Sequence, residues 1–137
     1  MAKDENPVIA IVDTSVWIDF FCARSARQVQ ALEYLIKNDG IICITGIILS
    51  ETLQGIRHDK EYWKTREYFE SLLYFPTTQS AFIRAAEIYR SLRRKGITIR
   101  KPLDCMIAAV ALEYDIPLLH NDRDFLPIEK HCGLKSL

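Results

Sequence analysis

Short apolar runs alternate with longer segments of helical periodicity along the chain. The run at 7–12 is mostly β-branched and lacks clean alternation, which is typical of a strand buried on both faces. Similar runs at 41–44, 74–75 and 117–120 predict three more strands, and 134–136 is a candidate fifth. Helices are expected between them, at 16–21, 26–37, 46–56, 60–72, 80–95 and 102–114. The pattern therefore predicts an α/β fold of three layers, with a mainly parallel central sheet of four to five strands flanked by helices.

Apolar stripes indicate which face of a predicted helix is buried. In the segment 26–37 the stripe consists of Val29, Leu32, Leu35 and Ile36. In the segment 80–95 it consists of Phe82, Ala85, Ala86, Tyr89 and Leu92. The segment 102–114 is apolar on nearly every side, including Leu103, and is expected to be buried.

Length and composition are consistent with one domain spanning residues 1–137. No apolar run approaches the roughly 18 residues of a membrane span, and the polar, acidic N-terminus lacks the layout of a signal peptide. We therefore expect a cytoplasmic protein without a membrane partner. The four cysteines are irregularly spaced, form no C-x-x-C pair and are expected to be mostly buried thiols: Cys22, Cys43, Cys105 and Cys132.

Acidic residues lie where the predicted strands end. Asp13 follows the first strand, Asp122 follows the fourth, and Glu51 lies in the helix after the second. These positions fall at the same end of a parallel sheet, where sites of α/β proteins form. Asp104 lies in the first turn of the helix that precedes the fourth strand, so it joins them if that helix begins at the same end.

Each acid also has a structural interpretation. Asp13 is a good helix cap, Asp104 is favoured by the helix dipole in a first turn, and Asp122 suits a turn. Glu51 differs, because it lies at the margin of an apolar helix face inside a hydrophobic run. A carboxylate there costs free energy unless it is paired or binds a metal.

Four converging carboxylates require cations or protons. Two like charges about 4 Å apart repel by about 4 kcal/mol at an effective dielectric constant of about 20. Lys101 and Arg123 lie near two of the acids in sequence. An all-oxygen set of ligands suits Mg²⁺, with Mn²⁺ as a substitute, rather than zinc.

Four segments that contain these acids resemble the motifs of the PIN domain family, in particular its VapC-type toxin ribonucleases. Residues 12–19 resemble the opening aspartate motif, and residues 50–55 the glutamate helix. Residues 102–109 resemble the third acidic motif, and residues 120–125 the last. The motifs occur in the family's order and span nearly the whole chain. One departure is His120, where many relatives carry Thr; its imidazole either contacts phosphate or packs.

The resemblance implies a PIN-like fold and a metal-dependent endoribonuclease, often acting on structured RNA such as tRNA or rRNA. It also implies a homodimer that a cognate antitoxin neutralises. One or two metal ions would be bound by the catalytic acids Asp13, Glu51, Asp104 and Asp122. Asp124 would be a further ligand or support the others, and Ser15 would donate a hydrogen bond near the first aspartate.

A basic stretch leads into the third motif. Residues 84–101 contain seven basic residues and one acid, a net charge of +6 in a chain of formal net charge zero. RNA requires a positive approach surface, so we predict RNA contacts from Arg93, Arg94, Lys95, Arg100 and Lys101. The alternative is a solvated helix face followed by a loop.

Other functions fit the pattern less well. A receiver-type phospho-acceptor domain uses a Lys-Pro pair like that at 101–102, but there it follows the last core strand. A haloacid-dehalogenase-type phosphatase needs Asp-x-Asp after the first strand, which Thr14-Ser15 does not provide. The remaining alternative is a non-catalytic PIN-fold module that binds RNA or protein. Aromatic residues of the first half are expected mainly in the core, or in a dimer or antitoxin interface: Trp17, Phe20, Phe21, Trp63, Tyr68 and Phe69.

Overall fold

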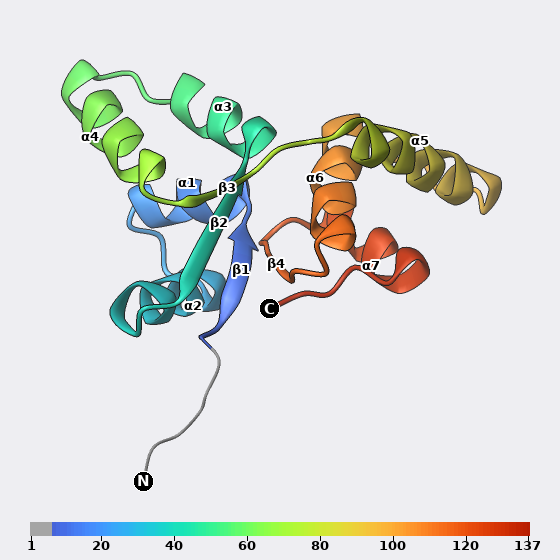
Figure 1. The fold of residues 1–137 in the computed structure, drawn as a ribbon, viewed down its shortest axis with the longest axis horizontal. Coiled ribbons are helices and arrows are strands. Elements are labelled where there is room, and N and C mark those ends of the chain that lie inside the picture. Colours follow the sequence, from blue (N-terminus) through green and yellow to red (C-terminus); the bar gives the residue numbers. More distant parts are fainter. Residues whose placement is uncertain (1–6) are drawn as a thin grey trace, which may run out of the picture.

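A parallel sheet forms the centre of the protein in the computed structural model, which describes residues 7–137 (Figure 1). Its strands are β1 (Ile9–Val12), β2 (Ile41–Thr45), β3 (Leu73–Phe75) and β4 (Leu118–Leu119). They are arranged in the order β3-β2-β1-β4, and each neighbouring pair is parallel. The predicted α/β fold class is confirmed. The candidate fifth strand is reduced to a single parallel bridge between Leu118 and Ser136.

Helices flank this sheet in two groups, with α1–α4 on one side and α5–α7 on the other (Figure 1). Their bounds are α1 (Thr14–Phe21), α2 (Arg27–Lys37), α3 (Gly46–Gln54), α4 (Asp59–Glu70), α5 (Gln79–Arg94), α6 (Pro102–Glu113) and α7 (Leu126–Cys132). Polar caps fix several starts: the Thr45 hydroxyl accepts the backbone N–H of Ile48 at 3.4 Å, and Thr78 caps α5 in the same way. Among the described residues, no helix is long and apolar enough to cross a membrane.

Two elements near the C-terminus differ from the prediction. The sequence pattern indicated no helix after the fourth strand, but a 3₁₀ helix, η1 (Arg123–Phe125), continues directly into α7. These helices are too short to show a repeated apolar stripe. Gly133, with a φ of 76°, ends α7 in the left-handed conformation that favours glycine.

The buried faces follow helical geometry more strictly than the predicted stripes. On α2 the buried residues are Val29, Leu32 and Leu35, spaced by three, whereas Ile36 is 42% exposed. The inclusion of Ile36 was wrong because it lies about 100° around the helix from Leu35. On α5 the predicted stripe was wrong at Phe82, which is 48% exposed, and at Ala86, which is also exposed, because the buried face runs through Ala81, Ala85, Ile88 and Leu92.

The α6 helix is buried along most of its length. Residues 107–111 are all buried against the sheet and α5, as its apolar sequence predicted. Leu103, in the exposed first turn, is 42% exposed and departs from that prediction. Cys43 and Cys105 are buried thiols, and burial raises the pKa of each to about 11. Cys132 is half-buried and Cys22 is exposed, so two of the four cysteines are buried rather than most of them.

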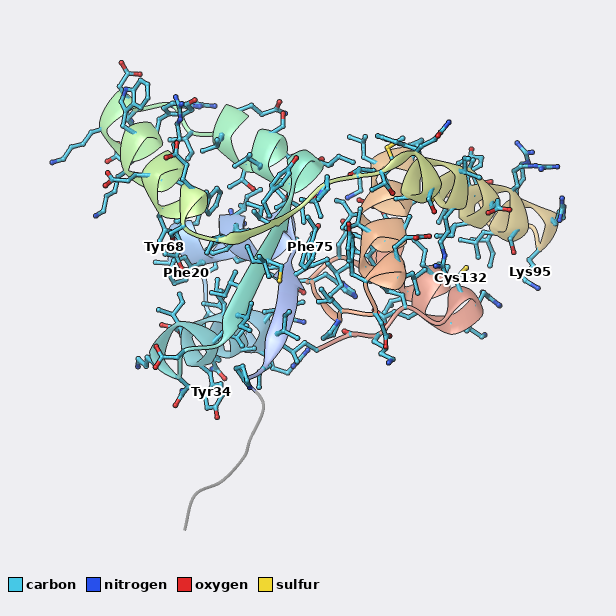
Figure 2. All side chains as sticks on the ribbon, viewed as in Figure 1. Phe20, Tyr34, Tyr68, Phe75, Lys95 and Cys132 are labelled. Atoms are coloured by element: carbon cyan, nitrogen blue, oxygen red, sulfur yellow. The ribbon has the colours of Figure 1, made fainter. Side chains whose placement is uncertain are left out.

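The aromatic residues of α1 and α4 form one cluster between these helices. Trp17 is fully buried, and its ring lies 4.9 Å from that of Phe69, centroid to centroid. Phe20 and Tyr68, both labelled in Figure 2, each pack edge-on against Trp17. Trp63 is 58% exposed and lies outside the core. The aromatic residues therefore divide between core and surface.

Candidate metal centre

Asp13 links the first strand to the first helix. It follows β1 and caps α1, where its carboxylate accepts the Ser15 backbone N–H at 3.0 Å and the Ser15 hydroxyl at 2.6 Å. The side chain is buried, with 4% exposed. Ser15 thus donates a hydrogen bond to the first aspartate, as the family resemblance implied. Asp13 can cap the helix and still bind a ligand, because only one of its two carboxylate oxygens accepts these hydrogen bonds.

Ser15 also connects the ends of β1 and β4. Its hydroxyl oxygen accepts the backbone N–H of Asn121 at 3.0 Å. The Asn121 side-chain amide donates to Asp19 on α1, also at 3.0 Å. The loop that carries Asp122 is therefore held against α1 by two hydrogen bonds.

Three carboxylates converge at this edge of the sheet: Asp104, Asp122 and Asp124. One oxygen of each lies within 4.8 Å of those of the other two, and we call these residues the acidic cluster. Asp104 joins because α6 begins at the same edge, which was the condition set by the sequence. Asp122 caps η1 and accepts the Asp124 backbone N–H at 2.9 Å, which fixes their relative positions.

Two cations lie over the acidic cluster. The Lys101 ammonium contacts the Asp122 carboxylate and lies 3.6 Å from Asp104 and 3.8 Å from Asp124. The Arg100 guanidinium donates to both oxygens of Asp124 at 3.2 Å. Two residues predicted to contact RNA therefore make intramolecular ion pairs in this structure.

Burial and mutual repulsion shift the pKa values of the carboxyl groups. Burial raises the pKa of Asp104 to about 7; Lys101 opposes this, and the charges of Asp13, Asp122 and Asp124 add to it. Burial also raises the pKa of Asp13, against its hydrogen bonds from Ser15. At Asp122 burial acts to raise the pKa, but the hydrogen bonds from Lys101 and the Asp124 backbone, together with the nearby positive charge of Lys101, outweigh it and lower the pKa. The same hydrogen bond raises the pKa of Lys101.

The chemistry of the acidic cluster fits a hard divalent cation. Oδ2 of Asp104 is buried and accepts no hydrogen bond from the described residues, and the Lys101 ammonium lies 3.6 Å from it. A buried carboxylate oxygen without a donor is costly, and a cation offsets that cost. All available ligand atoms are carboxylate oxygens, which suit Mg²⁺ or Mn²⁺.

Glu51 lies outside the acidic cluster but is connected to it through α1. It is partly exposed on α3, and its carboxylate accepts a 3.0 Å hydrogen bond from the Thr14 hydroxyl. The largest cost of burial thus falls on Asp13 and Asp104 rather than on Glu51, which the sequence had marked as the unusual acid. Thr14 was missed as a contributor, although its place beside Asp13 was a signal.

His120 is buried and packs, which is one of the two alternatives the sequence left open. Its ring lies 4.8 Å from that of Phe125, and its Nε2 pairs with Glu129. Its Nδ1 accepts the Asp122 backbone N–H at 3.2 Å. This arrangement places the ring proton on Nε2 and leaves no ring nitrogen for a phosphate. Glu129 was missed because it lies on the unpredicted helix α7.

The other three residues predicted to contact RNA, Arg93, Arg94 and Lys95, lie at the C-terminal end of α5. Arg93 and Arg94 are exposed in the last turn of α5, where positive charge complements the helix dipole. Lys95 lies at the outer end of this helix in Figure 2. The Arg93 guanidinium also lies over the Tyr89 ring, 5.7 Å from its centroid.

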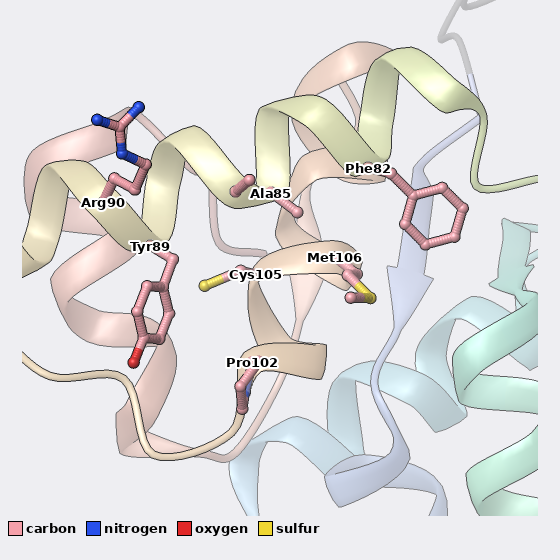
Figure 3. A pocket seen from close by; sticks show the side chains of 8 residues that line it. Phe82, Ala85, Tyr89, Arg90, Pro102, Cys105 and Met106 are labelled. Atoms are coloured by element: carbon pink, nitrogen blue, oxygen red, sulfur yellow. The ribbon is translucent and has the colours of Figure 1, made fainter.

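A separate apolar groove of about 330 Å³ lies between α5 and α6 (Figure 3). Phe82, Tyr89 and Met106 are among its lining residues, and it contains no carboxylate. Phe82, which lines the groove, is 48% exposed, and its chain neighbour Ile83 is also exposed. The groove is therefore a candidate for protein contact rather than for metal chemistry.

Comparison with known proteins identifies the family. The sequence profile of the PIN domain matches residues 10–130, which is most of the chain. The chain therefore belongs to the PIN domain family. Relatives with the VapC name include VapC ribonuclease Mb1587 of Mycobacterium bovis and ribonuclease VapC11 of Mycobacterium tuberculosis. Each is 30% identical to this chain over 128 residues, covering 92% of it and 96% of the relative.

Solved structures of toxin–antitoxin proteins share the fold. VapBC2 from Rickettsia felis, bound to a promoter DNA fragment, has a TM-score of 0.73 at 19% identity and covers 95% of this chain and 98% of that one. A toxin–antitoxin complex from Klebsiella pneumoniae has a TM-score of 0.68 at 24% identity, covering 87% and 92%. Mycobacterium tuberculosis VapC20, described as a Sarcin-Ricin loop cleaving toxin, has a TM-score of 0.65 at 18% identity, covering 94% and 98%. At these identities the likeness shows the fold.

Proposed function

We propose that this protein is a metal-dependent endoribonuclease that hydrolyses RNA phosphodiester bonds as the toxin of a toxin–antitoxin pair. The observation that carries the proposal is the acidic cluster at the carboxyl edge of a PIN-family sheet, with a buried Asp104 oxygen that accepts no hydrogen bond from the described residues. The ribonuclease names of relatives that are 30% identical over most of the chain support the reaction and its substrate.

The acidic cluster and Asp13 would hold Mg²⁺, or Mn²⁺ in its place, with Glu51 as a further acid on the α3 side. A bound ion supplies positive charge for the phosphate and a water molecule of lowered pKa. The charge of Asp13 raises the pKa of Asp104, so the two carboxylates interact electrostatically. This coupling supports assigning Asp13 to the same site.

Neighbouring side chains position these acids. Ser15 holds one oxygen of Asp13, and Thr14 holds one oxygen of Glu51. The backbone of Asp122 is fixed by the His120 ring, which Glu129 in turn orients. Such supporting contacts keep ligands in one orientation before a cation or a substrate arrives.

RNA would approach over the basic surface that leads to the acidic cluster. Arg93, Arg94 and Lys95 are exposed and place positive charge on the same α5–α6 side of the sheet as Asp104. Contacts with phosphates are independent of sequence and depend on salt. This matches a substrate recognised by shape, and structured RNA such as tRNA or rRNA is the proposed class.

Two protein partners belong to the proposal. A cognate antitoxin is suggested by the solved toxin–antitoxin complexes that share the fold. A second copy of the chain, forming a homodimer, is suggested by the apolar groove between α5 and α6 and by the exposed Phe82 and Ile83 beside it. A cytoplasmic location would give such a protein access to RNA.

The test is cleavage of tRNA and rRNA by purified protein with Mn²⁺, with and without a chelator. The wild type and Asp59→Asn, a matched change at an exposed site on α4, should cleave RNA only with metal. Folded Asp13→Asn should not cleave. Cleavage by Asp13→Asn, or in excess chelator, would refute the proposal. RNA binding without any cleavage would instead favour the non-catalytic binding module.

A further inference from the structure

Lys101 has an unusual position for a cation. It is the N-cap of α6, where the helix dipole disfavours positive charge, and its side chain makes no capping hydrogen bond. Its ammonium instead contacts Asp122 and lies within 4.0 Å of Asp104 and Asp124. The acidic cluster, rather than the helix, therefore accounts for where this charge lies.

The ammonium lies among the same carboxylates that are proposed to hold a metal. Their oxygens are within 4.8 Å of one another, and Lys101 contacts each residue of the set. A monovalent ammonium and a divalent ion repel each other and compete for the same oxygens. Both cannot keep full contact with the acidic cluster at once.

The Lys101 side chain can also move away from the acidic cluster. Its side chain is 52% exposed, whereas that of Asp104 is 8% exposed. A half-exposed lysine on a four-carbon stem retains other rotamers that reach solvent. Arg100 is attached differently, because its guanidinium is directed at Asp124 alone.

We propose that Lys101 is an internal counter-cation that neutralises the acidic cluster in the metal-free protein and must be displaced before a divalent ion binds. This inference rests on the metal centre proposed above and adds a regulatory element to it. The lysine stabilises the empty site and, by the same contacts, weakens its affinity for metal. The concentration of divalent ion at which the site fills is then set by Lys101 as well as by the acids.

The test is calorimetric titration of Mn²⁺ into chelator-stripped protein at one pH and ionic strength. Lys101→Met should bind Mn²⁺ roughly tenfold more tightly than the wild type, because the three charge contacts of this half-exposed lysine no longer have to be broken. Lys101→Arg, which keeps the charge, should bind no more tightly than the wild type. The matched control Lys95→Met removes a charge from the same basic stretch and should leave the affinity within about twofold of the wild type.

Thermal melting without metal gives a second measurement. Lys101→Met should melt at a lower temperature than the wild type in chelator and gain more from added Mn²⁺, because the acids lose their counter-charge. Equal Mn²⁺ affinity in Lys101→Met and the wild type would overturn the role of Lys101 and leave the metal centre intact. Failure of both proteins to bind Mn²⁺ would overturn the metal centre as well.

Discussion

Replacing Asp104 with Asn should stabilise the metal-free protein above neutral pH. Asp104 is 5% exposed, and its pKa rises from an ordinary value of 3.8 to about 7, mainly through burial. Between these two values the folded protein retains a proton that the unfolded chain has lost. Stability therefore falls as pH rises through this range, and the full cost is present above about pH 7. An amide is never ionised and avoids this cost.

The magnitude follows from the two pKa values. At about 1.4 kcal/mol for each pH unit between 3.8 and about 7, ionised Asp104 destabilises the fold by about 4 kcal/mol at pH 8. The gain from Asp104→Asn should fall below about 1 kcal/mol at pH 4, where the carboxyl is protonated in the folded protein. A loss of activity would thus accompany a gain in stability.

The measurement is urea unfolding of both proteins in chelator at pH 4 and pH 8. Glu67→Gln, an exposed carboxylate-to-amide change on α4, is the control and should shift the free energy of unfolding by less than about 0.5 kcal/mol at either pH. A difference between Asp104→Asn and the wild type that does not grow with pH would refute the reasoning. So would destabilisation at pH 8.

Three further predictions address other parts of the structure. Ser15→Ala removes the hydroxyl that holds Asp13 and Asn121, so the RNA cleavage rate should fall roughly 10- to 100-fold in a folded protein; a rate equal to that of the wild type would contradict this. Reversing Arg93, Arg94 and Lys95 to Glu should weaken RNA binding and reduce the slope of log affinity against log salt by up to about three, as measured by fluorescence anisotropy; an unchanged slope would exclude this surface. Leu118→Ala, in the fully buried β4, should lower the free energy of unfolding by about 2–5 kcal/mol, and a loss below about 1 kcal/mol in urea unfolding would place this strand outside the core.

The fold was largely predictable because buried parallel strands and amphipathic helices leave strong patterns. The runs at 7–12 and 41–44 and the helical segment at 80–95 correspond to β1, β2 and α5. The pattern failed at η1 and α7, whose few residues are placed by Phe125 and Ile128 packing into the core rather than by a local repeat. It also failed at Ile36 and Phe82, where apolar residues flank the buried face.

The candidate site was predictable in outline but not in its charge balance. Strand ends and the start of α6 place Asp13, Asp104 and Asp122 at one edge, which follows from topology. The ion pairs of Lys101 depend on the path of the 96–101 loop, which no periodicity encodes. The partnership of His120 with Glu129 likewise depends on a helix that the sequence did not reveal.

The central claim is that the acidic cluster binds a divalent ion and uses it to cut RNA. It is tested most directly by titrating Mn²⁺ into chelator-stripped protein and measuring the rate of RNA cleavage beside Mn²⁺ binding. Cleavage should appear at the Mn²⁺ concentration that fills the site, and folded Asp122→Asn should lose both together. Cleavage that is independent of Mn²⁺, or a folded Asp122→Asn protein that keeps both wild-type binding and wild-type cleavage, would contradict the account.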